Sequence, residues 1–89
     1  MDEVIDFSLN NILNPFNYEL NFEVQVPENT TIEVVLTNLS GKPLRKESFI
    51  AYGGVNSLTI PNTEGLPAGI YILQVKNKEK IINRKLIKK

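Results

Sequence analysis

Apolar and polar residues alternate with a period of two along most of this sequence. In the clearest run the apolar residues share one face, and they are Tyr18, Leu20, Phe22, Val24 and Val26. The residues between them are Glu19, Asn21, Glu23 and Gln25. Side chains of a strand point alternately to its two faces, so the pattern predicts a half-buried β-strand and fits no helix.

Further runs of the same kind are separated by turn residues. The breaks fall where Pro, Gly and Asn gather, at 27–30, 40–43, 53–54, 61–67 and 77–79. Between them strands are expected at 18–26, 31–38, 44–50, 57–60, 69–76 and 80–88, with a short edge strand near 6–9. About seven short antiparallel strands predict an all-β sandwich. We expect 14–89 to form this domain, with 1–13 as a linker or short edge strand.

The same alternation predicts the core and the surface. One core is expected from the inward-facing residues Leu20, Phe22, Val24, Ile32, Val34, Leu36, Leu58, Ile60, Tyr71, Leu73 and Val75. Val35, Ile70 and Ile72 lie opposite their strands' core faces, and one of Ile81 or Ile82 must also point outward. We expect Ile70 and Ile72 to join part of the last strand in a contiguous patch. Such a patch is typical of a docking site, and it would support weak self-association of an otherwise monomeric chain.

Composition argues against catalysis. Among the 89 residues, 42% are apolar, and there is no His, Cys or Trp. The commonest general base, the thiol nucleophile and the ligands that zinc prefers are therefore missing. Carboxylates such as Glu19, Glu23 and Glu33 alternate outward, as on a solvated sheet face. We expect no enzyme activity, cofactor, metal or small-molecule substrate; an acidic start with Asp2, Glu3 and Asp6 is a weak calcium ligand set at best.

Charge is distributed unevenly, although the net charge is zero. Residues 1–33 hold seven acidic side chains and no basic one, whereas residues 76–89 hold seven basic side chains and one acidic, Glu79. Two interpretations stay open: early and late strands attract each other, or a basic tail is presented to a partner. Nucleic acid is not expected as that partner, because the basic stretch has no aromatic residue for stacking. The acidic start also lacks the basic-then-apolar order of a secretory signal, so for an exported parent protein the export signal is expected upstream of it.

The most specific local pattern is Leu-Pro-Ala-Gly-Ile-Tyr at 66–71. A Leu, then a Gly and a Tyr entering a strand, resembles the tyrosine corner of immunoglobulin-like sandwiches. In that corner the Tyr hydroxyl bonds to a backbone group a few residues upstream. We therefore expect Leu66, Pro67, Gly69 and Tyr71 to be structural, and Gly41 to supply the positive φ of a turn.

The order of these landmarks along the chain resembles one family. The chain runs through Asn-Pro-Phe at 14–16, Asn-Leu-Ser-Gly-Lys at 38–42, the corner at 66–71 and Lys-Leu-Ile-Lys-Lys at 85–89. This is similar to the type A C-terminal sorting domain of the type IX secretion system. The resemblance implies a seven-stranded immunoglobulin-like sandwich that acts as an address label on an exported cargo. It further implies passage through the periplasm, recognition by the outer-membrane translocon and a shuttle protein, removal by a sortase, and a final location at the cell surface or outside the cell.

The resemblance assigns partner recognition to the last strand. Its residues are Lys85, Leu86, Ile87, Lys88 and Lys89, and the exposed patch adds Ile70 and Ile72. An open strand edge can pair with a partner by strand addition, with Leu86 and Ile87 entering pockets and the lysines meeting acidic rims. Without the resemblance, a plain closing strand with a solubilising tip would be favoured. Because terminal residues fray, we expect deletion of Lys88 and Lys89 to change stability by less than about 0.5 kcal/mol.

Two other functions remain as alternatives. An accessory carbohydrate-binding or adhesive sandwich would present a row of exposed aromatic residues, and only Phe16 and Tyr52 are placed outside a strand's core face. A structural spacer domain would have polar surfaces at both ends. The sequence does not identify the cargo or the sortase cleavage position, which is expected at or before 1–6.

Overall fold

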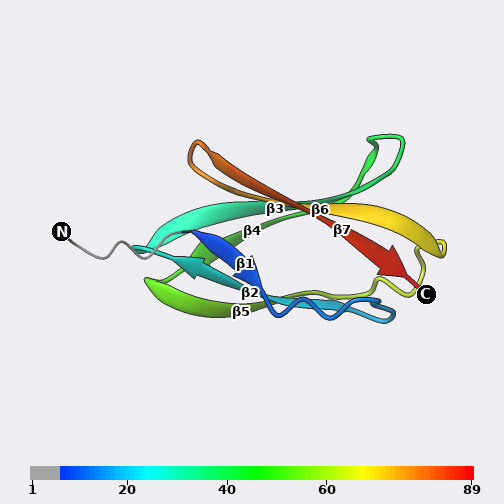
Figure 1. The fold of residues 1–89 in the computed structure, drawn as a ribbon, viewed down its shortest axis with the longest axis horizontal. Helices are drawn as coiled ribbons and strands as arrows, with labels where there is room; N and C mark the ends of the chain where they lie inside the picture. Colours follow the sequence, from blue (N-terminus) through cyan, green and yellow to red (C-terminus); the bar gives the residue numbers. More distant parts are fainter. Residues whose placement is uncertain (1–6) are drawn as a thin grey trace.

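Seven antiparallel strands form two facing sheets (Figure 1). The structure is a computed structural model and describes residues 7–89. The strands are β1 (Ser8–Asn10), β2 (Leu20–Val26), β3 (Thr30–Asn38), β4 (Pro43–Ala51), β5 (Gly54–Ile60), β6 (Gly69–Asn77) and β7 (Lys80–Lys88). One sheet has the order β1-β2-β5 and the other β4-β3-β6-β7. The predicted all-β sandwich is confirmed, and the described residues include no helix that could cross a membrane.

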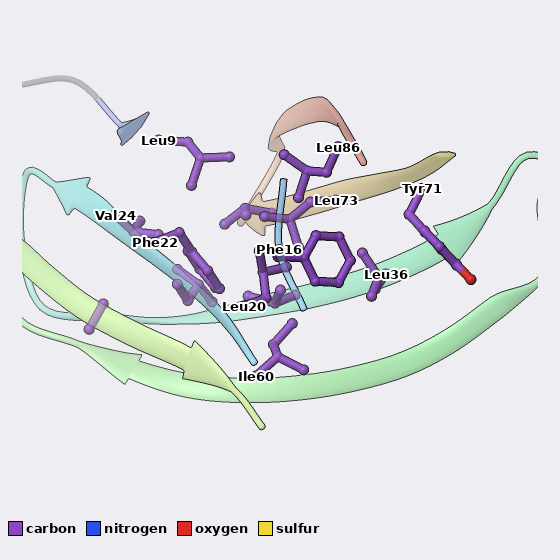
Figure 2. Close-up of a cluster of buried hydrophobic side chains, with 14 of the residues drawn as sticks. Leu9, Phe16, Leu20, Phe22, Val24, Leu36, Ile60, Tyr71, Leu73 and Leu86 are labelled. Carbon is purple, nitrogen blue, oxygen red and sulfur yellow. The ribbon is translucent and has the colours of Figure 1, made fainter. Parts of the chain in front are cut away.

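The period of two holds in the central strands. In β2, every residue on the predicted inward face is buried and every residue between them is half-buried. The predicted core is confirmed at ten of its eleven positions, and the exception, Leu58, is only partly buried. Leu58 lies on β5, an edge strand of the three-stranded sheet, so no neighbouring strand covers its outer side. Figure 2 shows the buried side chains that fill the space between the sheets.

Two aromatic residues near the start of β2 differ from the prediction. Tyr18 is 71% exposed, because β2 begins at Leu20 and the alternation does not extend back to Tyr18. Phe16 is 1% exposed, although it lies outside the named strands. Tyr52 is exposed, as expected. An alternating pattern fixes the two faces of a strand but not the residue at which the strand starts.

The first segment contacts both sheets. Phe7 and Leu9 are buried in the common core, and β1 pairs with β2. Asn11 then takes a positive φ of 52°, which Asn tolerates better than most residues. The Leu13 N–H still donates to Asn21 O in the three-stranded sheet at 3.3 Å. A few residues later the segment reaches the four-stranded sheet. The expected short edge strand thus lies at 8–10; the part of it at residue 6, like Asp2, falls outside the described residues.

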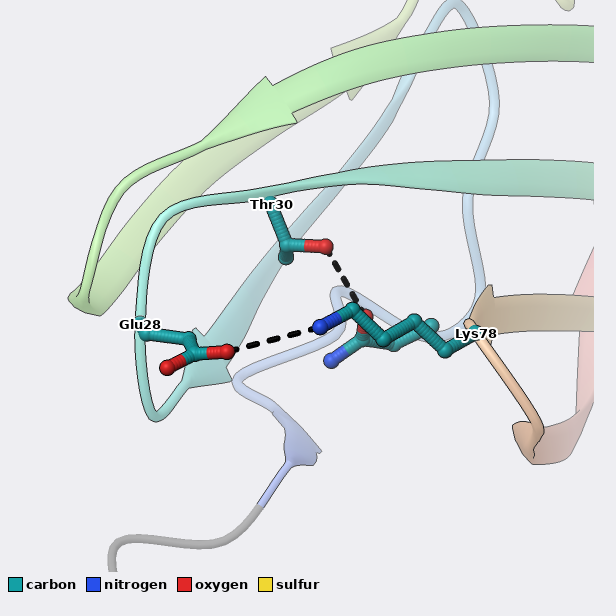
Figure 3. Close-up of polar contacts among 4 residues, drawn as sticks. Glu28, Thr30 and Lys78 are labelled. Atoms are coloured by element: carbon teal, nitrogen blue, oxygen red, sulfur yellow. Dashed lines mark hydrogen bonds and ion pairs between the residues drawn. The ribbon is translucent and has the colours of Figure 1, made fainter.

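The end of the sandwich near Phe7 is joined by polar contacts between two turns (Figure 3). Thr30 Oγ1 donates to Asn77 Oδ1 at 3.1 Å, and Lys78 Nζ lies 3.4 Å from Glu28 Oε2. Asn77 is buried, so its hydrogen bond satisfies a polar group that water does not reach. The Glu28–Lys78 pair is exposed on both sides, and such pairs contribute little. The two turns are therefore held mainly by the threonine–asparagine contact.

Two turns of the sandwich contain a glycine with a positive φ, and one of them is followed by a strand that begins earlier than the alternation indicated. β5 begins at Gly54, three residues before the expected start, and Gly54 has a φ of 112°. The Asn56 side chain closes the preceding loop by accepting from Tyr52 N–H and donating to Tyr52 O. The β3–β4 turn contains Gly41 with a φ of 88°, which confirms its predicted role.

Leu9 tests whether the first segment is part of the folded core. Leu9→Ala should lower the free energy of unfolding by about 2–4 kcal/mol, because it removes a buried side chain and leaves a cavity. Leu13→Ala, a matched change at a site that is 61% exposed, should cost less than about 0.5 kcal/mol. Denaturant unfolding of both variants makes the comparison. Equal midpoints would mean that β1 is not packed as described.

Candidate functional site

The last strand, β7, has two distinct faces. It pairs with β6 over nine consecutive residues without a shift of register. Leu86 is 1% exposed and Lys88 is 4% exposed, so these alternate residues point into the sandwich. Lys85, Ile87 and Lys89 are exposed on the opposite face. The expectation that Leu86 enters a partner's pocket therefore does not fit this structure, because its side chain is already buried in the core.

The Lys88 side chain is buried, and its ammonium group is hydrogen-bonded to polar groups nearby. Lys88 Nζ donates to Lys89 O at 2.8 Å and to Asn17 Oδ1 at 3.4 Å. The aliphatic stem of a lysine can pack against apolar surface while the charged head remains solvated or bonded. Lys88 thus acts as part of the packing between the last strand and the segment before β2.

That segment is bonded to β7 through Phe16. Phe16 forms a parallel bridge with Lys88. Phe16 N–H donates to Ile87 O at 2.9 Å, and Lys89 N–H donates to Phe16 O at 3.0 Å. Ile87 N–H donates to Asn14 Oδ1 at 2.9 Å. The end of β7 is therefore paired on both sides, and the expectation that it frays is wrong.

The tyrosine corner lies directly against this bridge. Tyr71 is buried, and its hydroxyl donates to Pro67 O at 2.5 Å. Leu66 is also buried. Gly69 has a φ of 153°, a conformation that L side chains rarely adopt. The predicted tyrosine corner is confirmed.

The ring of Phe16 connects the corner to the last strand. Phe16 and Tyr71 meet edge to face, with ring centroids 6.2 Å apart and an interplanar angle of 67°. Figure 2 shows Phe16 among the core side chains, with the Tyr71 hydroxyl directed away from them. A further contact comes from Thr63, whose hydroxyl donates to Asn17 O at 2.7 Å. Three stretches far apart in the sequence, 14–17, 63–71 and 85–89, thus meet at one end of the sandwich.

Five of the seven proposed recognition residues share the outer face of β6 and β7. We call this set the tail face, and it consists of Ile70, Ile72, Lys85, Ile87 and Lys89. Ile70 opposes Ile87, and Ile72 opposes Lys85. Ile87 is 50% exposed, Ile70 is exposed and Ile72 is half-buried.

The tail face remains open because the first segment packs elsewhere. Phe7 and Leu9 lie inside the core and do not cover Ile70 or Ile72. The expected outward apolar patch is therefore present, with lysines beside it. The two remaining candidates, Leu86 and Lys88, do not belong to it. Among residues 7–89 no group of His, Cys, Asp or Glu side chains gathers to hold a metal ion.

Sequence reasoning missed the partners that hold the last strand. Asn14, Phe16 and Asn17 precede the first long strand and show no periodicity, so nothing in the pattern paired them with 85–89. The available signal was an Asn-Pro-Phe motif with a large apolar residue between polar ones. A bulky aromatic residue in such a setting is often buried against a distant element.

The comparison with known families agrees with this geometry. Residues 14–89 match the family described as Secretion system C-terminal sorting domain. The match begins at Asn14, whose side chain accepts a hydrogen bond from Ile87 N–H in the last strand. A search of the curated proteins gives no match.

Tyr71 tests the corner. Tyr71→Phe keeps the ring but removes the bond to Pro67 O, which should lower the free energy of unfolding by about 1–2 kcal/mol. Tyr52→Phe is the matched control at an exposed site, and it should change stability by less than about 0.5 kcal/mol. Both are measured by denaturant unfolding. An unchanged midpoint for Tyr71→Phe would contradict the corner.

The last two residues test how firmly β7 is held. Deleting Lys88 and Lys89 removes the bridge to Phe16 and a buried stem, so we expect a loss of about 1–2 kcal/mol. Lys89→Ala keeps the backbone bond and should cost less than about 0.5 kcal/mol. Thermal unfolding of both variants measures the loss of stability. It distinguishes the loss of about 1–2 kcal/mol expected from the structure from the loss of less than about 0.5 kcal/mol expected from the sequence. A truncated chain as stable as the parent would show that the bridge contributes nothing.

Proposed function

The chain belongs to the family of type IX secretion system C-terminal sorting domains, and on that premise we propose that its tail face is the surface read during export. As a member of this family it is a sorting signal, which implies export to the cell surface or secretion and interaction with the type IX machinery. We further propose that the outer-membrane translocon and a shuttle component read the tail face after transit through the periplasm. A sortase then removes the domain from its cargo.

The observation that supports this proposal is the convergence at one end of the sandwich. The stretches at 14–17, 63–71 and 85–89 meet there and fix the last strand through backbone bonds at Phe16. A label carried by unrelated cargoes needs a surface that does not depend on the cargo. Bonding the last strand on both sides supplies such a fixed surface, because it orders the backbone that carries Lys85 and Ile87.

The chemistry of the tail face suits a protein partner. Two of its apolar members, Ile70 and Ile87, lie side by side across the ladder, and Lys85 and Lys89 are exposed on the same face. Desolvation of an apolar patch supplies affinity, and peripheral charges guide encounter and discriminate between partners. We therefore expect a partner surface with an apolar centre and an acidic rim.

The carbohydrate-binding alternative has weaker support. Tyr18 and Tyr52 are the exposed aromatic residues within 7–89. Tyr18 precedes the start of β2, whereas Tyr52 contacts Asn56, which opposes Val24 nearer the other end of β2. The two rings therefore form no common platform for a sugar ring. The proposal for a sorting label does not require one.

Reporter export tests the proposed function. Residues 1–89 are fused to a soluble reporter in a cell that has a type IX system, and surface and culture-medium reporter are measured. The double variant Ile70→Thr and Ile87→Thr keeps β-branched residues but makes the tail face polar. We expect it to lower delivery at least about tenfold, since it removes two apolar contacts from the interface.

A matched double variant controls for loss of surface isoleucine and valine. Ile50→Thr and Val55→Thr alter exposed apolar residues away from the tail face, and we expect normal delivery. Unfolding midpoints of both proteins show that each remains folded. Equal delivery by the two variants would remove the recognition role of the tail face. No delivery by the unmodified fusion would contradict the sorting function of this chain.

A further inference from the structure

The backbone of β7 has a side that its neighbour β6 does not use. In an antiparallel pair, alternate residues direct both N–H and C=O away from the partner strand. Ile87 and Lys89 are such residues, because their N–H groups donate to Asn14 and Phe16 outside the sheet. The register to β6 has no shift, so Ile81, Asn83 and Lys85 must also direct their backbone groups outward.

Among residues 7–89, the backbone bonds on this side of β7 lie at its end, at Ile87 and Lys89. The Leu13 N–H bonds to Asn21 in the other sheet, and no backbone–backbone hydrogen bond joins residues 7–13 to β7. The Arg84 side chain extends from β7 to the first segment and donates to Leu9 O at 3.1 Å. Within residues 7–89 no hydrogen bond joins the outward backbone groups of 81, 83 and 85 to another element. We call this stretch, 81–85, the open edge.

The charged residues within β7 are all basic. β7 contains Lys80, Arg84, Lys85 and Lys88 and no acidic residue. The other edge strand of the same sheet, β4, mixes Arg45 and Lys46 with Glu47. Pairing two copies of β7 would bring only basic side chains together, which disfavours self-association through this edge. An acidic partner strand would place its carboxylates beside Arg84 and Lys85, two basic residues of the open edge.

We propose that the open edge binds an extended acidic segment of a partner protein, which adds to the sheet as a further strand beside β7. Its backbone would bond to Ile81, Asn83 and Lys85. Its acidic residues would lie beside Arg84 and Lys85, and apolar residues would lie beside Ile81 and Ile82. Strand addition of this kind obtains affinity from main-chain hydrogen bonds and specificity from the side chains along the strand. The inference rests on the proposed function, because it states how the export machinery would engage this domain.

Amide hydrogen exchange can detect the added strand. Residues 1–89 are mixed with a synthetic peptide of repeating Glu-Glu-Val-Val, and exchange is followed by NMR. We expect exchange at 81, 83 and 85 to slow at least about tenfold, as new hydrogen bonds protect these amides. Ile87 and Lys89, which are already bonded, should change little.

Two control peptides separate pairing from simple charge attraction. The same acidic peptide with N-methyl groups on alternate residues keeps its charge but cannot pair. A Lys-Lys-Val-Val peptide can pair but has the wrong charge. Neither should protect 81, 83 and 85. Equal protection by the basic peptide would overturn the acidic specificity, and no protection by any peptide would overturn the open edge as a binding site.

A substitution at Asn83 can remove one outward N–H group of the open edge without changing the pairing with β6. Asn83→Pro removes an outward N–H, and proline is tolerated in edge strands where that group faces solvent. Asn83→Thr keeps the N–H and loses the same contact with Gln74, so it is the matched control. We expect Pro to abolish protection at 81 and 85 and Thr to preserve it. Should the Pro variant fail to fold, the peptide comparison on the parent chain still decides.

Reporter export then distinguishes failure of this inference from failure of the proposed function. We expect the Pro variant to lower delivery at least about tenfold and the Thr variant to deliver normally, because main-chain bonds supply much of the affinity of an added strand. Normal delivery by a folded Pro variant would overturn the open edge while the sorting function stands. Absence of delivery by the unmodified fusion would remove the sorting function itself, whatever the peptides do.

Discussion

Phe16 packs edge to face on Tyr71 while its backbone bonds to Ile87 and Lys89. The ring occupies the core and the backbone extends the sheet, so one residue joins the first segment, the tyrosine corner and the last strand. Without it, the end of β7 would keep β6 and the side-chain contacts of Asn14 and Asn17, but Lys88 would lose the neighbour that it bridges. The position of the tail face depends on this contact, because the exposed residues of β7 are fixed by the buried ones.

Periodicity predicted most of the fold, for a physical reason. Residues between the two sheets are apolar at every second position, so the inward faces of β2, β3 and β6 can be read from the sequence, although Val35, Ile70 and Ile72 are apolar on the outer faces. The corner at 66–71 was predictable as well, because Gly69 and Tyr71 are required by local geometry. The role of Phe16 was not, since it depends on a contact with residues about 70 positions away. Leu86 and Lys88 were misjudged for the same reason: a terminal strand looks open until its second neighbour is known.

The uneven charge along the sequence leaves a basic strand at one edge of the sandwich. Attraction between early and late strands was one of two interpretations, and the Glu28–Lys78 pair at the turn end is highly exposed on both sides. Glu23 instead accepts from Asn11, and Arg84 donates to a backbone carbonyl. In both contacts a charged side chain is hydrogen-bonded to an uncharged group. Among residues 7–89, Arg84 of β7 is thus bonded to a backbone carbonyl and not to a carboxylate, which is the property that a partner of opposite charge would use.

The first segment runs in the same direction as β7, which places the two ends of the described chain at opposite poles of the sandwich. Phe7 lies beside the β6–β7 turn, and Lys89 lies one strand length away, about 30 Å at roughly 3.3 Å per residue. Phe7, the first described residue, therefore lies at the pole opposite to the end of the tail face at Lys89. Under the proposed function, this separation leaves the surface that is read clear of the pole at which the described chain starts.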